Sequence, residues 1–557
     1  MELHTNIPTP LQKLYYWEKA HPSDLFMTQP MGNGKVEEYT WQRTAQEVRR
    51  MATYLKSLNL PDDAKIGILS KNCAHWVMAD LAIWMAGYTS VPLYPTLGAE
   101  SVRQILEHSE TQLLFVGKLD DWDVMKPGVP EMLKCVSFPL SPPNTYETWD
   151  EIIKQHQPFK ESPTRKHEEL ATIIYTSGST GVPKGVMTSF DAMVYAAAGA
   201  CRELSISKDD RILSYLPMSH VFERYVVEQA ALQAGFQVFF AESLDTFLQD
   251  LQRARPTLFI SVPRLWTKFQ AGVLNKLPQK KLNLFLKIPV LSGLIRKKVL
   301  TGLGLEQVRI AGSGSAPLSS DIIQWYRNLG LELLEGYGMS ENFAYSHMTK
   351  PGRVRVGYVG EPLPGVLQRI SPEGEVQIKS PASMMGYYKA PDITAESFTD
   401  DGYLKTGDLG EIDELGRLKL TGRSKELFKT SKGKYVAPAP IENRIVAHPQ
   451  VEMVCVSGAD YPQPHCLVML SEDAYPKRND PNFRKEFEET IKPIIDDINS
   501  TVDPHEALQF VAVVNDQWTI ENAFLTPTMK MKRNIIEKAY RELWDDWYAA
   551  RKKVIWQ

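Results

Sequence analysis

A loop with the residue types of a phosphate-binding site follows an apolar, strand-like run. The stretch 173–185 reads IIYTSGSTGVPKG, so glycines, hydroxyls and one lysine stand close together. Glycines let the backbone approach a polyanion, and consecutive backbone N–H groups form an anion-binding nest. Because Pro183 precedes Lys184 and Gly185 follows it, the loop lacks the glycine-lysine-serine/threonine ending of a Walker loop. The stretch predicts phosphate binding and disfavours a P-loop kinase.

The elements around this loop alternate between β-branched apolar runs and helical patterns. KIGILSKN (65–72) leads into AHWVMADLAIWMAG, and TQLLFVG, RILSYLP, FQVFFAES, TLFISVPR, QVRIAGSG and LELLEGYG follow in the same style. Such alternation is typical of an α/β fold with functional loops at the strand ends. We therefore predict a large N-terminal domain of parallel-type sheets with covering helices.

Beyond residue 350 the pattern changes to short alternating strands with glycine turns, which indicate a small antiparallel β region. A tail of mixed strand and helix signals follows and is long enough for one small, mobile α+β domain. We place the domains at 1–423 and 424–557, with a hinge at Lys425.

Composition bounds the class of protein. The 557 residues are 43% hydrophobic and 23% charged, which predicts a globular protein of two or more domains. A net charge of −4 argues against nucleic-acid binding. Five scattered cysteines without a C-x-x-C pair fit reduced thiols, and we find neither an apolar leader nor a long apolar run. These features predict a cytoplasmic protein.

The segment 276–298, KLPQKKLNLFLKIPVLSGLIRKK, stands apart because it is basic and apolar and contains no acid. Such a segment fits peripheral contact with a membrane or docking of an acidic carrier protein. It also fits a surface helix pair with solvated lysines, and Pro278 and Pro289 limit the length of any helix.

The loop and six further blocks resemble, in order, the signatures of the adenylate-forming superfamily, which includes acyl-CoA synthetases and luciferases. These blocks are LPMSHVFER (216–224), AGSGSAPLS (311–319), EGYGMSE (335–341), GYLKTGD (402–408), GRSKELFKTSKGKYVAPAPIE (422–442) and LTPTMKMKR (525–533). PMSHVFER, KTSKGKYVAP and TPTMKMKR are similar to the long-chain fatty acyl-CoA synthetase branch.

The resemblance implies that ATP and Mg²⁺ activate a medium-to-long fatty acid as an acyl-adenylate, and that CoA then takes the acyl group. In-line chemistry at a phosphate needs positioning and charge neutralisation above all. Two alternatives stay open, namely an acyl-carrier protein as acceptor and a non-enzymatic nucleotide- or lipid-binding relative. Intact Glu341, Asp408, Arg423 and Lys530 weigh against the second.

The resemblance also implies roles for individual residues. The β- and γ-phosphates would be held by Thr176, Ser177, Gly178, Ser179, Thr180, Gly181 and Lys184. The wall beside adenine and the acyl carbonyl would consist of Gly312, Ser313, Gly314, Ser315 and Ala316. The next block would place Tyr337 near adenine, Ser340 at the α-phosphate and Glu341 on Mg²⁺, with Gly338 and Met339 between them.

The remaining roles fall on both sides of the predicted hinge. Asp408 would accept hydrogen bonds from the ribose with Arg423 as its partner, while Gly433 and Lys434 would reach the CoA tunnel. Lys530 would be the catalytic lysine of adenylation, because the spacing to Arg533 favours it over Lys532. His220 would lie beside the acyl carboxylate or be a core histidine. Arg264 and Trp266 either face the acyl channel or pack.

Overall fold

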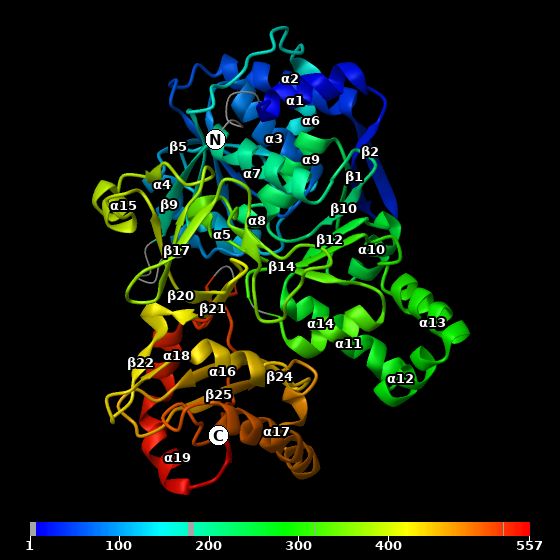
Figure 1. The fold of residues 1–557 in the computed structure, drawn as a ribbon. Coiled ribbons are helices and arrows are strands. Elements are labelled where there is room, and N and C mark those ends of the chain that lie inside the picture. The colour runs from blue at the N-terminus through cyan, green and yellow to red at the C-terminus, as the bar shows by residue number, and fades with distance from the viewer. Residues whose placement is uncertain (1–6, 177–182, 317, 527–528) are drawn as a thin grey trace.

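The chain folds into a large N-terminal domain with two wide sheets and a smaller C-terminal domain (Figure 1). The computed structural model describes residues 7–176, 183–316, 318–526 and 529–557. No helix within these ranges combines the length and the apolar character that crossing a bilayer requires.

The first wide sheet has eight strands in the order β19-β9-β8-β4-β3-β5-β6-β7. Its middle is parallel, whereas β8 and β9 form an antiparallel hairpin and β19 pairs antiparallel with β9. The predicted phosphate loop connects β8 to β9. The strands are β3 (Lys65–Leu69), β4 (Thr89–Leu93), β5 (Thr111–Val116), β6 (Lys134–Ser137), β7 (Glu147–Thr148), β8 (Leu170–Thr176), β9 (Lys184–Ser189) and β19 (Gly386–Tyr387).

The second wide sheet has nine strands in the order β16-β15-β14-β13-β12-β10-β11-β1-β2. It is parallel from β14 to β1 and antiparallel at both edges. The strands are β1 (Leu25–Gly32), β2 (Lys35–Thr40), β10 (Arg211–Ser214), β11 (Gln237–Phe240), β12 (Leu258–Ser261), β13 (Ile310–Ser313), β14 (Leu333–Tyr337), β15 (His347–Met348) and β16 (Glu361–Pro362).

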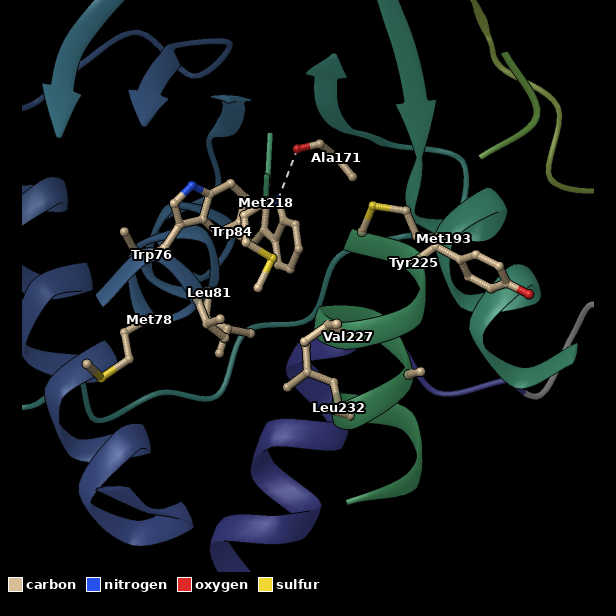
Figure 2. Close-up of a cluster of buried hydrophobic side chains, with 14 of the residues drawn as sticks. Trp76, Met78, Leu81, Trp84, Ala171, Met193, Met218, Tyr225, Val227 and Leu232 are labelled. Carbon is tan, nitrogen blue, oxygen red and sulfur yellow. Dashed lines mark hydrogen bonds between the residues drawn. The ribbon is translucent and has the colours of Figure 1, made fainter. Parts of the chain in front are cut away.

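The main core contains side chains from both wide sheets and from the helices α2 (Trp41–Ser57), α3 (Ala74–Met85) and α7 (Phe190–Glu203). Every residue of α3 is buried. Figure 2 shows part of this core, where the Trp84 indole N–H donates to the carbonyl of Ala171 at 2.9 Å. Further cores involve α4 (Ala99–His108) on the first sheet, and α10 (Phe247–Ala254), α11 (Pro263–Lys276) and α14 (Ser320–Asn328) on the second.

An antiparallel sheet in the order β17-β18-β20-β21 leads to the C-terminal domain, as the glycine-rich alternating pattern predicts. Its strands are β17 (Leu367–Ile370), β18 (Glu375–Lys379), β20 (Leu404–Ile412) and β21 (Leu418–Arg423). After β21 come a short 3-10 turn at Ser424–Glu426 and a hairpin of β22 (Phe428–Lys429) and β23 (Tyr435–Val436).

The C-terminal domain is built on a four-stranded sheet with a separate core on each face. Its strands are β24 (Val451–Ser457), β25 (His465–Leu470), β26 (Val511–Val513) and β27 (Val554–Trp556), and its helices are α16 (Pro438–Ile445), α17 (Pro481–Thr501), α18 (Arg533–Tyr540) and α19 (Trp544–Ala550). The predicted fold class, α/β followed by a small α+β domain, is confirmed. The exact boundary at 423/424 and the hinge at Lys425 stay predictions.

Candidate active site

Two neighbouring parallel strands end beside each other at the centre of the site. β13 pairs with β14 through Ser313 and Glu335, so the loops after both strands start at one sheet edge. A Cβ atom on Gly314 would lie 3.5 Å from the Phe222 ring and 3.6 Å from the carbonyl of Gly336. A Cβ on Gly338 would lie 2.5 Å from the backbone of Ala344, which a larger residue there would displace. The chain is therefore closely packed at this edge, and Gly338 in particular leaves no space for a larger side chain.

A hydrogen-bonded trio links this edge to the antiparallel sheet. The Tyr337 hydroxyl donates to Asp408 Oδ2 at 2.6 Å, and Arg423 Nε donates to Asp408 Oδ1 at 2.8 Å. β20 and β21 pair Asp408 directly with Arg423. Asp408 is buried, and burial together with the Asp408 charge raises the pKa of Tyr337 well above its ordinary value. The trio is therefore a fixed acceptor-donor group of the kind that hydroxyls of a sugar require.

Tyr387 on β19 connects the phosphate loop to the predicted metal ligand. Its hydroxyl donates to Glu341 Oε1 at 2.7 Å, and Lys184 Nζ lies 5.4 Å from the centre of its ring. The backbone N–H of Met384 also donates to the carbonyl of Glu341. β19 reaches this position by pairing Tyr387 with Val186 of β9. A cation and an oriented carboxylate that both contact one tyrosine suit a polyphosphate with a hard cation.

The C-terminal domain contributes Lys530 to the same region. Solvent reaches the Lys530 side chain, yet surrounding protein lowers its pKa, the Arg423 charge adds to the lowering, and Asp408, Glu341 and Glu426 oppose it. All four groups are thus within electrostatic range of the Lys530 ammonium. The lysine carries a positive charge to the site from a different domain.

His220 is held in one tautomer by its own backbone. Its Nδ1 accepts a hydrogen bond from the backbone N–H of Phe222 at 3.2 Å, so the neutral ring carries its proton on Nε2. Burial lowers the pKa of His220 to about 4, and the positive charge of Lys530 adds to this. His220 is therefore a neutral donor at physiological pH.

The depressed pKa of His220 predicts the pH dependence of the site. Because the folded-state pKa lies below the ordinary 6.5, the neutral ring stabilises the fold above that value, and this contribution is lost as pH falls towards about 4. We expect the adenylation rate to show no His220 titration between neutral pH and about pH 5, close to one unit above this pKa. Comparing the pH–rate profiles of wild type and His220→Gln checks this, because a wild-type step near pH 6.5 that the variant lacks would contradict it.

Arg224, from the same sequence block as His220, is a structural residue. Its guanidinium is fully buried and pairs with Asp80 and Glu228, and it donates to Thr172 at 2.6 Å. It also lies 5.3 Å from the ring of Trp76 in the core of Figure 2. Buried ions at such a place must be neutralised by their partners.

Arg224→Met is expected to cost about 3–5 kcal/mol of stability, because it leaves two buried carboxylates without their cation. The urea midpoint of the transition that unfolds the large domain measures this loss. Arg296→Met replaces an exposed cation and should change the free energy of unfolding by no more than about 0.5 kcal/mol. Equal effects of both substitutions would contradict the structural role.

Other predicted site residues divide into three groups. Thr176 and Lys184 flank the loop and are paired in the β8–β9 register, whereas Ser177, Gly178, Ser179, Thr180 and Gly181 lie outside the described residues. The predicted wall begins with Gly312 and Ser313 at the end of β13 and continues with Gly314, Ser315 and Ala316 after it, and the block with Met339 and Ser340 follows β14. Ser313 Oγ is buried and has no hydrogen-bond partner among the described residues, which fits a contact made by a ligand.

The third group lies in the C-terminal domain and its connection. Lys425 is exposed in the 3-10 turn after β21. Gly433 has a φ of 76°, and with Lys434 it closes the β22–β23 hairpin. The hairpin is tied to its own domain, because Ser431 donates to the carbonyl of Tyr461. Gly433 and Lys434 therefore stay predicted CoA-site residues without a described contact to the Tyr337–Asp408–Arg423 trio.

Two neighbours of the site escaped sequence analysis. Tyr387 lies in the stretch GYYKA, which matches no motif. It reaches the site only because β19 pairs with β9. Asn342 is buried beside Glu341 and accepts from the backbone N–H of Met339 at 3.0 Å. Its position directly after the YGMSE block is the one signal that sequence offers.

Known proteins match this chain along most of its length. The AMP-binding enzyme family matches residues 16–388, and the AMP-binding enzyme C-terminal domain matches residues 426–552. The long-chain-fatty-acid–CoA ligase FadD15 of Mycobacterium bovis is 30% identical, with 93% of each chain covered. Long chain acyl-CoA synthetase 4 of Arabidopsis thaliana is 32% identical, over 93% of this chain and 88% of its own.

Solved structures agree on the fold. The crystal structure of the anthranilate CoA ligase AuaEII with anthranoyl-AMP superposes with a TM-score of 0.78 at 20% identity, covering 96% of this chain and 98% of its own. The family match spans well over half of the chain and includes the predicted phosphate loop, Tyr337 and Glu341. The chain therefore belongs to the AMP-binding enzyme family.

Proposed function

We propose that the protein is an ATP- and Mg²⁺-dependent fatty acid–CoA ligase for medium-to-long chains. It makes an acyl-adenylate with release of pyrophosphate, then transfers the acyl group to CoA with release of AMP. The observation that carries this proposal is the Tyr337–Asp408–Arg423 trio with Lys530 of the other domain in electrostatic range. The names of relatives covering most of both chains support the fatty acid and CoA as substrates.

Each residue has a task in the adenylation step. Both oxygens of Asp408 are oriented by Tyr337 and Arg423, so their free lone pairs accept the ribose hydroxyls of ATP. Lys184 and the loop hold the phosphates that leave. Glu341, fixed by Tyr387, would hold Mg²⁺, which when bound neutralises phosphate charge. Lys530 meets the negative charge that develops as the carboxylate attacks the α-phosphate.

Thioester formation needs the CoA thiol at the same carbonyl. We propose that the C-terminal domain turns about Lys425, which withdraws Lys530 and brings Gly433 and Lys434 to the site. Lys425 suits a hinge because it is exposed in a short turn with little packing to lose.

An interdomain ion pair supports this arrangement. Arg264, at the start of α11, pairs with Glu452 of β24 in the C-terminal domain. Trp266 of the same block is buried and donates to the carbonyl of Gly312 at 3.2 Å, so it packs behind the predicted wall. The pair joins the domains in the arrangement that places Lys530 near Asp408.

Arg264→Glu is expected to slow acyl-adenylate formation about fivefold, because an exposed ion pair contributes up to about 1 kcal/mol. Adding Glu452→Arg should restore most of the rate, and thioester formation from pre-made acyl-adenylate should not change. Single-turnover assays of the two steps measure this. Lys268→Glu, one turn along α11, is the matched control. Failure of the double variant to recover would contradict the role of this pair.

The proposed function is tested by incubating purified protein with ATP, Mg²⁺ and acids from acetate to a twenty-carbon chain, with and without CoA. Mass spectrometry follows acyl-adenylate, acyl-CoA, AMP and pyrophosphate. AMP and acyl-CoA with a chain-length optimum are the expected result. An adenylate that CoA never consumes would favour an acyl-carrier protein, and no adenylate from any acid would favour a binding protein.

A further inference from the structure

The basic apolar segment forms a helical hairpin that projects from the large domain. α12 (Gln279–Lys287) and α13 (Pro289–Gly302) extend to one side in Figure 1, away from the C-terminal domain. Pro278 is the N-cap of α12 and Pro289 is the first residue of α13, so the prolines limit the length of the helices as the sequence predicts. Leu282 is buried, and Leu286, Ile295 and Val299 pack against the core under α10, α11 and α14. One face of the hairpin is therefore fixed to the domain.

The opposite face carries apolar side chains that the described chain leaves in solvent. Val290 is 80% exposed, Leu294 66% and Leu284 59%, and Ile288 and Leu291 are exposed as well. These five large apolar residues lie on α12, on α13 and at Ile288 between them, and a group of exposed apolar side chains on a protein surface marks an interaction site. We call these five residues the outer patch.

Cations surround the outer patch. Lys280, Lys281 and Lys287 lie three or four positions from Leu284, on neighbouring turns of α12. Lys297 and Lys298 follow Leu294 by one turn on the exposed side of α13. The segment 276–298 has seven cations and no acid in a chain of net charge −4. Within the described part of the chain none of the seven forms an ion pair, so their charge is available to a partner.

We propose that the α12–α13 hairpin docks on a lipid bilayer that contains anionic lipids. The outer patch enters the interface between headgroups and acyl chains, and the surrounding lysines bind the headgroups. A bilayer fits better than an acidic protein, because the five residues of the outer patch are all flexible aliphatic ones and include no aromatic anchor. Docking depends on this surface alone. The purpose of docking, which is access to fatty acids dissolved in the bilayer, depends on the proposed function.

Vesicle flotation with the full chain tests the proposal. The probes are vesicles of phosphatidylcholine alone and of equal parts phosphatidylcholine and phosphatidylglycerol. We expect binding to the anionic vesicles, weak binding to the neutral ones, and weakening by salt, because salt screens the lysines. If the wild-type chain bound neither kind of vesicle, or bound both equally, the proposal would be overturned.

Two sets of variants separate the contributions. One removes charge and the other removes apolar surface, and each has a control set of exposed residues outside the hairpin. The charge set is Lys280→Gln, Lys281→Gln and Lys287→Gln, with Lys126→Gln, Lys160→Gln and Lys552→Gln as control. The apolar set is Leu284→Ser, Val290→Ser and Leu294→Ser, with Met132→Ser, Leu244→Ser and Leu415→Ser as control.

The charge set should weaken partition to anionic vesicles by about a hundredfold, because each lysine near such a surface contributes roughly a fivefold factor. The apolar set should weaken it by at least about tenfold. The controls should bind like wild type. All variants should form adenylate from a short, water-soluble acid at the wild-type rate, which separates this test from that of the proposed function. Equal losses in the controls, or binding of a purified acidic carrier protein in place of vesicles, would overturn the proposal.

Discussion

Replacing Lys530 by Ala is expected to lower acyl-adenylate formation by about 10²- to 10³-fold or more, while thioester formation from pre-made acyl-adenylate stays near the wild-type rate. The charges of Asp408 and Glu341 both act on the pKa of Lys530, so the C-terminal domain places this ammonium within electrostatic range of the two carboxylates. The attack of a carboxylate on a phosphate needs a positive charge where the two anions meet, whereas transfer to CoA takes place after the domain has turned.

Lys532→Ala is the matched control, because it removes a cation two residues away at the start of α18. It should leave both half-reactions close to wild type. Pyrophosphate release in a single turnover reports the first step, and acyl-CoA formation from synthetic acyl-adenylate reports the second. Equal loss of both steps in Lys530→Ala would contradict a role confined to adenylation, and a larger loss in Lys532→Ala would move that role to the neighbouring lysine.

Local sequence pattern predicted most elements but not the way in which strands pair. KIGIL and the helix after it appear as β3 and α3 where the pattern indicates, since every one of their side chains is buried. The nine-stranded sheet, by contrast, pairs β1 with β11, more than two hundred residues along the chain. Such pairing depends on the register between distant segments. Periodicity within one segment carries no information about that register.

The site shows the same division. Motif order pointed to Tyr337, Asp408 and Arg423, which the structure joins by hydrogen bonds. Motif membership did not distinguish His220 from Arg224, because the carboxylates that pair with Arg224 lie outside the motif. Tyr387 was missed for another reason, since a two-residue strand at a sheet edge leaves no pattern in the sequence.

Glu341→Gln is expected to weaken the Mg²⁺ dependence and to lower kcat/KM for adenylation by about a hundredfold or more, because a metal that neutralises phosphate charge contributes several kcal/mol. Glutamine keeps the size of the side chain and still offers an oxygen to the Tyr387 hydroxyl, which binds Oε1 at 2.7 Å. The substitution therefore removes the negative charge that a hard cation prefers while it preserves the local structure.

Tyr387→Phe is the complementary variant, since it removes the hydrogen bond and leaves the carboxylate. A hydrogen bond to a charged group contributes about 1.5–3 kcal/mol, so we expect a loss of about tenfold to about a hundredfold, with Mg²⁺ dependence close to wild type. Pyrophosphate exchange into ATP, measured across Mg²⁺ concentrations, distinguishes the two variants. If Glu341→Gln kept the wild-type Mg²⁺ dependence and lost activity only as Tyr387→Phe does, Glu341 would orient the loop and would not bind the metal.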